Sequence, residues 1–215
     1  MDDERLVRRC YKFHLSKIDI VKYNFWARDV RHLLQSFGFG EVWDQQGVGD
    51  ELRFLKIFKQ RCIDIDTQLW SESVNTSRKL DCYASFKREL SLEPYLTSLD
   101  KPIFKLMLCR FRTSTHNLKI ETGRWNDTPR VERLCEMCNL NQVEDEFHFL
   151  LVCPFYTCIR SKYIANYFYN PPLHHKFVLL MSSRKVDTLR KLSRYIFYAT
   201  KLRKDNTRIS ETQTA

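Results

Sequence analysis

Hydrophobic residues recur every three or four positions along most of the chain, which is the spacing of amphipathic helices. One such series consists of Trp26, Val30, Leu33, Leu34 and Phe37. Asn24 can cap the start of this helix and Gly38 can end it. The same pattern predicts further helices at 51–72, 77–90, 101–115, 145–152, 155–168, 173–181 and 185–204. The pattern fades between Lys119 and Arg133, where Gly123 and Pro129 interrupt it.

These elements predict an all-α fold, a multi-helix bundle with an inserted Cys/His-rich module. Five glycines and six prolines in 215 residues are too few for a turn-rich β-sandwich, and 43% hydrophobic residues suffice for a core. No run of 18 uncharged apolar residues exists, so we expect no membrane span. We expect four regions: a helical region at 1–122, the module at 123–170, C-terminal helices at 171–204 and a disordered tail at 205–215.

Four of the five glycines lie between the first two predicted helices, at positions 38, 40, 47 and 49. A glycine-rich loop can bind phosphate, but this one lacks the Lys-Ser/Thr ending of a P-loop and follows no strand. The simpler interpretation is a helix–helix connection in which Val42 and Trp43 reach the core.

The charge balance concerns partners rather than fold. The chain has 36 Lys and Arg against 26 Asp and Glu, a net charge of +10. Polyanions such as nucleic acid are natural partners for such a chain, although many basic proteins bind none. The acidic start Met1-Asp2-Asp3-Glu4-Arg5 makes secretion unexpected, so we expect an intracellular protein, in the nucleus or the cytoplasm. Its eight cysteines are then reduced thiols or metal ligands.

Four Cys and His residues share one short window, with the pattern Cys135-x2-Cys138-x9-His148-x4-Cys153. Zinc prefers thiolate and imidazole ligands in tetrahedral geometry, and a Cys-x2-Cys turn brings two sulfurs together. We therefore expect one structural Zn²⁺. Because all four positions would be protein ligands, no open position remains for a catalytic zinc. The acidic run at 144–146 suits the start of the helix that carries His148.

The spacing from His148 to Cys153 is unfavourable in an uninterrupted α-helix. Five residues at 100° each place the two side chains about 140° apart. The helix must therefore end at Cys153, and Pro154 favours that end because the residue before proline avoids the α region. The alternative is that these cysteines are small buried side chains, as we expect for Cys10, Cys62, Cys82, Cys109 and Cys158.

Three stretches are distinctive: RLCEMC at 133–138, VEDEFHFLLVCPFY at 143–156 and RFRTSTHNLKIETGR at 110–124. Together with SFGFGEVW at 36–43, they resemble the zinc-binding tail that follows the reverse-transcriptase domain in LINE-like, non-LTR retrotransposons. The resemblance covers most of residues 24–168. It implies a helical, zinc-braced accessory region that grips template RNA or target DNA. It also implies that the metal ligands are Cys135, Cys138, His148 and Cys153.

We expect no enzymatic activity. No Asp-Asp box lies between strand-like segments, no nucleophile motif is present, and the polymerase domain of the resembled family would precede Met1. The leading hypothesis is therefore a nucleic-acid-binding module that binds RNA or DNA mainly through phosphates, without a small-molecule substrate. The alternative is a structural or protein-interaction module in which zinc only stabilises the fold. The sequence does not indicate an oligomeric state.

Basic residues crowd the approach to the Cys-x2-Cys turn. The candidate phosphate contacts are Arg110, Arg112, Lys119, Arg124, Arg130 and Arg133. Phe111 and Trp125 lie among them and could stack on unpaired bases, although such side chains more often belong to the core. A second basic cluster at 184–204 fits a solvated helix face better.

Overall fold

The computed structural model describes residues 5–18 and 26–213. These residues form helices and no β-strand; the only β-type pairings among them are two isolated antiparallel bridges, Leu134–Val143 and Tyr169–Pro172. The predicted all-α fold is therefore confirmed. The chain divides into two compact units, residues 1–68 and 69–215. Within the described residues, every helix is too short or too polar for a membrane span.

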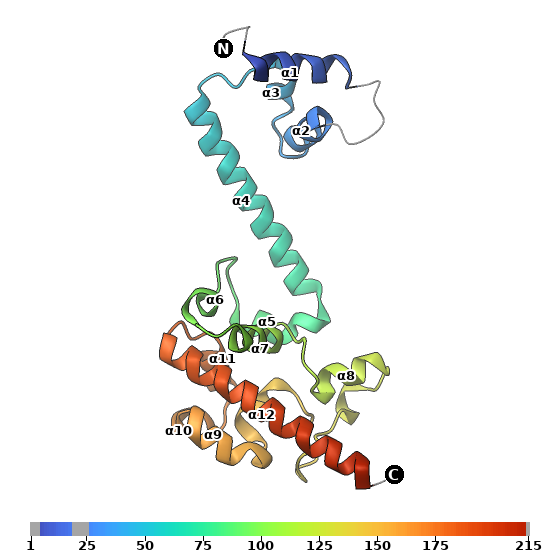
Figure 1. Ribbon diagram of the computed structural model, residues 1–215, viewed down its shortest axis with the longest axis vertical. Coiled ribbons are helices and arrows are strands. Elements are labelled where there is room, and N and C mark those ends of the chain that lie inside the picture. The colour runs from blue at the N-terminus through green and yellow to red at the C-terminus, as the bar shows by residue number, and fades with distance from the viewer. Residues whose placement is uncertain (1–4, 19–25, 214–215) are drawn as a thin grey trace. The chain divides into compact units, whose positions relative to one another are not determined.

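The first unit contains α1 (Leu6–Ser16), α2 (Trp26–Ser36), α3 (Gly40–Gln45) and the first part of α4 (Glu51–Thr76) (Figure 1). Its small core consists of Ala27, Leu34 and Trp43, with Phe39, Phe54 and Phe58 packed against them. The glycine-rich segment thus contains a short helix, α3. Its Trp43 is buried, as expected of a connection that reaches the core, and Val42 packs against the same cluster.

Helix α2 corresponds to the first helix predicted from the sequence, with Asn24 as its expected cap and Gly38 as its expected end. Gly38 has φ +83°, and the Phe39 N–H donates to the Leu34 carbonyl at 2.7 Å, so the glycine ends the helix as predicted. The proposed cap, Asn24, lies outside the described residues. The buried face differs from the expected one, because Trp26 and Leu33 are 55% and 42% exposed. Of the predicted series, Leu34 is buried and Val30 packs against the core, and Ala27, which is outside the series, is fully buried beside them.

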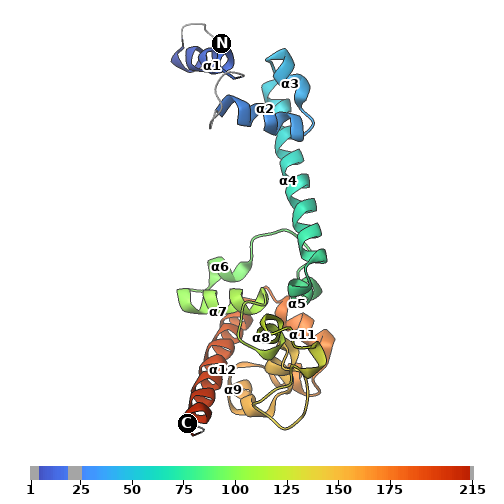
Figure 2. The same ribbon diagram turned by 90° about the vertical axis from the view of Figure 1, so that its right-hand side faces the viewer.

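The second unit is arranged around the long helix α12 (Val186–Gln213), which packs against α7 and α9 (Figures 1 and 2). Besides the end of α4, it contains η1 (Arg78–Leu80), α5 (Asp81–Phe86), α6 (Pro94–Ser98), α7 (Pro102–Arg112), α8 (Lys119–Trp125), η2 (Arg130–Glu132), η3 (His148–Val152), η4 (Pro154–Tyr156), α9 (Thr157–Tyr163), α10 (Asn166–Tyr169) and α11 (His174–Met181). η3 is a π-helix, and η1, η2 and η4 are 3₁₀-helices.

Four stretches in this unit differ from the sequence prediction. The helix expected at 155–168 is divided into η4, α9 and α10, because the backbone is extended at Ile164, with φ −114° and ψ 129°. The helix expected at 77–90 ends at Phe86, and residues 87–93 are not helical. Helix α8 occupies part of the stretch where the pattern fades, with Gly123 inside it. Helix α12 continues to Gln213, so the tail expected to be disordered from residue 205 is helical as far as it is described. Polar side chains do not prevent helix formation when the helix continues from a packed segment.

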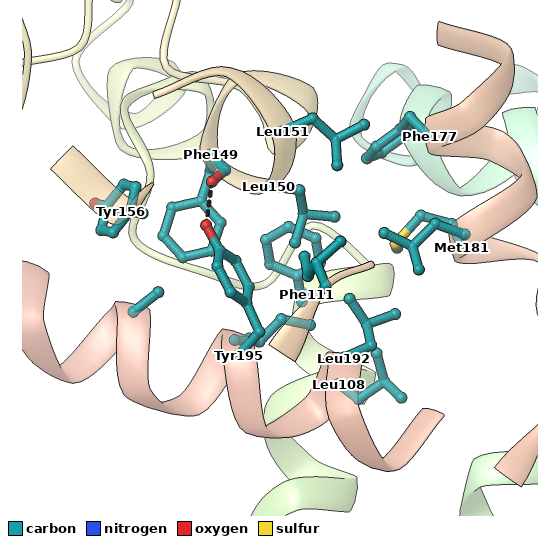
Figure 3. Close-up of a cluster of buried hydrophobic side chains, with 14 of the residues drawn as sticks. Leu108, Phe111, Phe149, Leu150, Leu151, Tyr156, Phe177, Met181, Leu192 and Tyr195 are labelled. Carbon is teal, nitrogen blue, oxygen red and sulfur yellow. Dashed lines mark hydrogen bonds between the residues drawn. The ribbon is translucent and has the colours of Figure 1, made fainter. Parts of the chain in front are cut away.

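The core of the second unit lies where α7, η3, α11 and α12 meet (Figure 3). Phe149, Leu150 and Leu151 of η3 are each at most 2% exposed and project into it. The Tyr195 hydroxyl of α12 donates a hydrogen bond to the Phe149 carbonyl at 2.6 Å. Burying each such large apolar side chain contributes about 1.5–3 kcal/mol. The core therefore fixes η3, the segment that begins at His148, against α12.

The substitution Tyr195→Phe should destabilise the second unit by about 1–3 kcal/mol, because it leaves the buried Phe149 carbonyl without its donor. The free energy of unfolding from urea denaturation, followed by circular dichroism, measures this. Tyr198→Phe is the matched control on the same helix, since Tyr198 is 41% exposed, and should change the value by less than about 0.5 kcal/mol. Equal effects of the two substitutions would contradict the role of the hydrogen bond.

Candidate metal centre

Cys135, Cys138, His148 and Cys153 converge on one point. Their ligand atoms all lie within 4.8 Å of one another. The sulfurs of Cys135 and Cys153 are 3.9 Å apart, and the Cys138 sulfur is 3.4 Å from His148 Nε2. Cys138 is partly exposed, whereas the other three side chains are buried. The four residues selected from the sequence therefore form a cluster that could hold a metal ion.

The separations fit tetrahedral coordination. With metal–sulfur and metal–nitrogen bonds of about 2.3 and 2.0 Å, tetrahedral geometry requires about 3.8 Å between two sulfurs and about 3.5 Å between sulfur and nitrogen. The two measured distances, 3.9 and 3.4 Å, are close to these values. Three thiolates and an imidazole are also ligands that transition metals bind well. Two of the separations therefore match a tetrahedral site, and all four ligand atoms lie within 4.8 Å of one another, so the residues present fit a metal ion.

The first two ligands lie on a short loop closed by backbone pairing. The Cys135 N–H donates to the Gln142 carbonyl at 2.9 Å, and the Glu144 N–H donates to the Arg133 carbonyl at 2.9 Å. The pKa of Cys135 is raised mainly by its hydrogen bond with the Cys153 sulfur, and that of Cys138 mainly by burial; the backbone N–H groups of Met137 and Leu140 offset part of each rise. Backbone pairing therefore closes the loop that carries the two sulfurs.

The other two ligands are brought together by a π-helical turn. The Cys153 N–H donates to the His148 carbonyl at 2.8 Å, five residues earlier. A turn closed over five residues returns residue i+5 to about the side of residue i, whereas an α-helix would rotate it away. Cys153 itself has extended backbone angles, φ −53° and ψ 121°, before Pro154. The helix end at Cys153 is thus confirmed, but the wider turn was not foreseen.

The orientation of His148 is set by groups around it. Its Nδ1 lies 3.2 Å from the side-chain oxygen of Gln142, so Nδ1 carries the hydrogen and Nε2 is left to face the sulfurs. Its backbone N–H donates to the Asp145 carboxylate at 2.8 Å, which caps the start of this helix. Of the acidic run at 144–146, Asp145 is therefore the residue that caps the helix.

The thiols affect one another. A hydrogen bond with the Cys153 sulfur, together with burial, raises the pKa of Cys135 to about 12. The same hydrogen bond lowers the pKa of Cys153. Burial raises the pKa of Cys138. Because a metal binds the thiolate rather than the thiol, metal binding must displace protons from Cys135 and Cys138.

Glu144 joins residues 133–144, the loop that carries Cys135 and Cys138 and is called the metal loop below, to the rest of the unit. Its side chain is fully buried, and it accepts two hydrogen bonds from the Arg203 guanidinium of α12, both at 2.8 Å. It also accepts the backbone N–H of Lys119 at 2.8 Å, at the first turn of α8. These contacts explain why α8 begins where it does and why α12 passes beside the site.

Glu146 makes a second internal connection. It accepts hydrogen bonds from the Ser114 hydroxyl at 2.9 Å and from His116 Nε2 at 3.0 Å. Burial raises the pKa of Glu146, but the hydrogen bonds and charge of His116 and the Ser114 hydrogen bond lower it, and the net shift is downward. The carboxylate therefore stays charged and fixes the 113–118 turn to the helix that carries His148.

The five remaining cysteines lie outside this cluster. Cys62, Cys82 and Cys109 are partly buried, whereas Cys10 and Cys158 are exposed. The expectation that all five are buried side chains is therefore wrong for these two. Cys158 lies in the first turn of α9 and is exposed, and the cluster contains Cys153 in its place.

Two of the six candidate phosphate contacts are used inside the protein. The Arg112 guanidinium is buried, donates to the Met181 carbonyl, pairs with Glu93 at 3.1 Å and lies over the ring of Phe86. The Arg133 guanidinium donates to the carbonyls of Thr128 and Ile120 at 2.9 and 2.7 Å. We therefore omit Arg112 and Arg133 from any nucleic-acid surface.

Gly123 makes the placement of Arg133 possible. A Cβ at this position would lie 2.7 Å from the Cγ and Cδ of Arg133, closer than two carbons can approach. The glycine therefore does not break the helix. It lets the Arg133 side chain pass along α8 to the carbonyl of Ile120.

The other four basic candidates lie nearer the surface. Lys119 pairs with Glu136, and Arg124 pairs with Glu121 at 3.2 Å and donates to the Arg78 carbonyl. Arg110 and Arg130 are exposed. Of the two aromatic candidates, Phe111 is 2% exposed and belongs to the core, whereas Trp125 is 73% exposed. The six residues therefore do not form one continuous basic surface.

Comparisons of the chain with protein-family models, with curated protein sequences and with solved structures find no match. The functional interpretation therefore rests on the residues of the site and on their geometry.

Substituting a ligand should remove the metal and destabilise the second unit. His148→Ala and Cys138→Ser should each lower the bound metal from one ion per chain to a small fraction. Each should also lower the melting temperature by about 10 °C or more, because the loop loses its cross-link. Elemental analysis and thermal denaturation measure the two effects. Cys158→Ser, the control, replaces an exposed thiol near the site and should retain both metal and stability.

Gln142 offers a finer test. Gln142→Leu removes the acceptor for His148 Nδ1 and should weaken metal affinity about 10–100-fold, as measured by competition with a chromophoric chelator. Gln142→Glu keeps an oxygen at the same place, so its affinity should stay within a fewfold of the original. The role assigned to Gln142 would be refuted if the leucine variant bound metal as tightly as the glutamate variant.

Proposed function

We propose that the four side chains hold one structural Zn²⁺ and that the second unit is a non-catalytic nucleic-acid-binding module. The observation that carries the zinc assignment is the convergence of the four ligand atoms within 4.8 Å, with one sulfur–sulfur distance of 3.9 Å and one sulfur–nitrogen distance of 3.4 Å that suit tetrahedral coordination. Tetrahedral sites with three sulfurs and one nitrogen are typical of zinc. Four protein ligands leave no position for a substrate, so the role is structural.

The loop that carries the first two ligands supports a stabilising role for the metal. Between Cys135 and Gln142 only Cys135 is buried, and Met137 and Cys138 are partly buried. Such a loop gains little from apolar burial, while ordering each residue costs about 1–2 kcal/mol. A structural zinc contributes about 10–16 kcal/mol of binding free energy. Metal binding would therefore supply the stabilising free energy that burial of the loop side chains does not provide.

Charge supports the nucleic-acid part of the proposal. Almost all of the net charge of +10 lies in residues 69–215. Several glutamates of this unit, including Glu93, Glu121 and Glu144, are already paired with cations inside the protein. Exposed cations such as Arg110 and Arg130 remain on the surface, where phosphate groups can reach them.

The resemblance to the zinc-binding tail of non-LTR retrotransposon reverse transcriptases agrees with this proposal. Its most specific stretch, residues 110–156, includes the four ligands as well as the residues that contact Glu144 and Glu146 from α8 and the 113–118 turn. We propose that the chain is related to that family as an accessory region without polymerase or endonuclease chemistry.

Binding to nucleic acid should depend steeply on salt. We expect the zinc-loaded protein to bind a fluorescently labelled single-stranded RNA or DNA of 12 nucleotides. The logarithm of the affinity should fall linearly with the logarithm of salt concentration, by about 0.7 per phosphate contact. Fluorescence anisotropy from 50 to 300 mM NaCl measures the slope.

Two controls separate this proposal from its alternative. The ligand variant Cys138→Ser should bind more weakly, because its surface is no longer held in place. Absence of binding by the metal-loaded protein at 50 mM salt would refute the nucleic-acid proposal. It would favour a structural or protein-interaction module in which the metal only stabilises the fold.

A further inference from the structure

A groove of about 350 Å³ lies between α7, the 113–118 turn and α12, within the second unit. This volume falls in the range of small-ligand pockets, about 300–1,000 Å³. Its apolar floor consists of Met107, which is partly exposed, and of four well-packed side chains that are each at most 4% exposed: Phe111, Leu118, Phe149 and Ile196. The groove therefore has a fixed shape and an apolar base that a flat ligand could cover.

Among the described residues, two of the three Lys and Arg side chains that line the groove have no acidic partner. Arg110, in the last turn of α7, and Lys204, on α12, line it from two different helices, and both are exposed. Within the described part of the chain neither is in an ion pair, and no Asp or Glu lines the groove. The third cation, Arg203, is engaged by Glu144. The positive charges of Arg110 and Lys204 are therefore available to a ligand in the groove.

The remaining lining is neutral and polar. Thr115, Asn117 and Thr200 offer hydroxyl and amide groups above the apolar floor. Such groups can donate to or accept from the edge of a nucleobase. Two cations, hydrogen-bonding groups and an apolar floor together suit an anion that carries a flat ring. A nucleotide has all three complementary features.

We propose that this groove holds one nucleotide of a single-stranded nucleic acid, with its phosphate between Arg110 and Lys204 and its base against the apolar floor. The inference rests on the proposed nucleic-acid binding and names the place where it occurs. A duplex is excluded as the ligand of the groove, because its bases are stacked and expose only their edges. RNA and DNA share the required chemistry.

The test uses the full-length, metal-loaded protein and labelled hexanucleotides. Arg110→Gln and Lys204→Gln should each weaken binding of hexauridylate or hexathymidylate roughly tenfold and reduce the salt slope by about 0.7. Lys201→Gln is the matched control, because Lys201 is an exposed cation of the same helix that does not line the groove. It should weaken binding less than twofold. Comparing the two probes shows whether the 2′-hydroxyl contributes.

Two further measurements locate the base. An abasic hexamer, with the same phosphates and no bases, should bind at least tenfold more weakly than hexathymidylate. A hexamer that carries 4-thiouridine should cross-link under ultraviolet light to peptides from residues 107–118 and 196–207. Equal binding of the abasic probe, or cross-links confined to other peptides, would overturn the inference.

The possible failures are distinguishable. If the unaltered protein binds hexamers but Arg110→Gln and Lys204→Gln lose no more affinity than Lys201→Gln, the groove is refuted and nucleic-acid binding stands. If the unaltered protein binds no hexamer and no 12-nucleotide strand at 50 mM salt, both proposals are refuted. Melting temperature and metal content of each variant show that the fold is intact.

Discussion

The second unit depends on the hydrogen bonds that the buried carboxylate of Glu144 accepts from Arg203 and from the Lys119 N–H. A charge without solvent exposure is tolerated only when it is fully paired, and here Arg203 and the Lys119 N–H supply the hydrogen bonds. The backbone of the same residue pairs with Arg133 and with Ile120. One residue thus joins the metal loop, α8 and α12. Removing the side chain would leave the partly buried guanidinium of Arg203 without its partner and loosen all three segments.

This connection also places the proposed zinc site and the groove in one rigid body. Arg203 and Lys204 are adjacent on α12: the first is held by Glu144, and the second lines the groove. The 113–118 turn, which forms another wall, is fixed by Glu146 through Ser114 and His116. The acidic run beside the candidate metal ligands therefore holds two walls of the groove, so order at one site supports order at the other.

The sequence predicted the parts of the structure that depend on local pattern. The four ligands share a short window, and the end of the helix at Cys153 follows from Pro154. The positions of most helices follow from apolar spacing. Contacts between distant segments were not predictable in this way: Arg112 reaches Met181, and Arg203 reaches Glu144, across 69 and 59 positions. A charged side chain in a sequence does not show whether its partner is solvent, phosphate or a buried carboxylate.

Gly123 and the C-terminal end of α12 also show that tertiary contacts cannot be predicted from local sequence pattern. The glycine indicated a break because it lacks a side chain, but the space it leaves is occupied by Arg133, whose position depends on the fold. Residues 205–213 are mostly polar, and their helical state follows from continuation of α12 out of the core. In both places tertiary packing overrides local propensity, which is weak for single residues.

The π-helical turn at His148–Val152 has a consequence for how this segment can vary. A π-turn holds one residue more than an α-turn, so the chain gains a position without losing the alignment of its ends. Here the gained position lets one turn bury Phe149, Leu150 and Leu151 while His148 and Cys153 meet on its other side. Deleting one of these residues could restore an ordinary α-helix, but only by rotating part of the apolar triplet into solvent. The length of this segment is therefore fixed by two requirements, burial of the apolar triplet and the approach of His148 to Cys153. A change in length that meets one requirement fails the other.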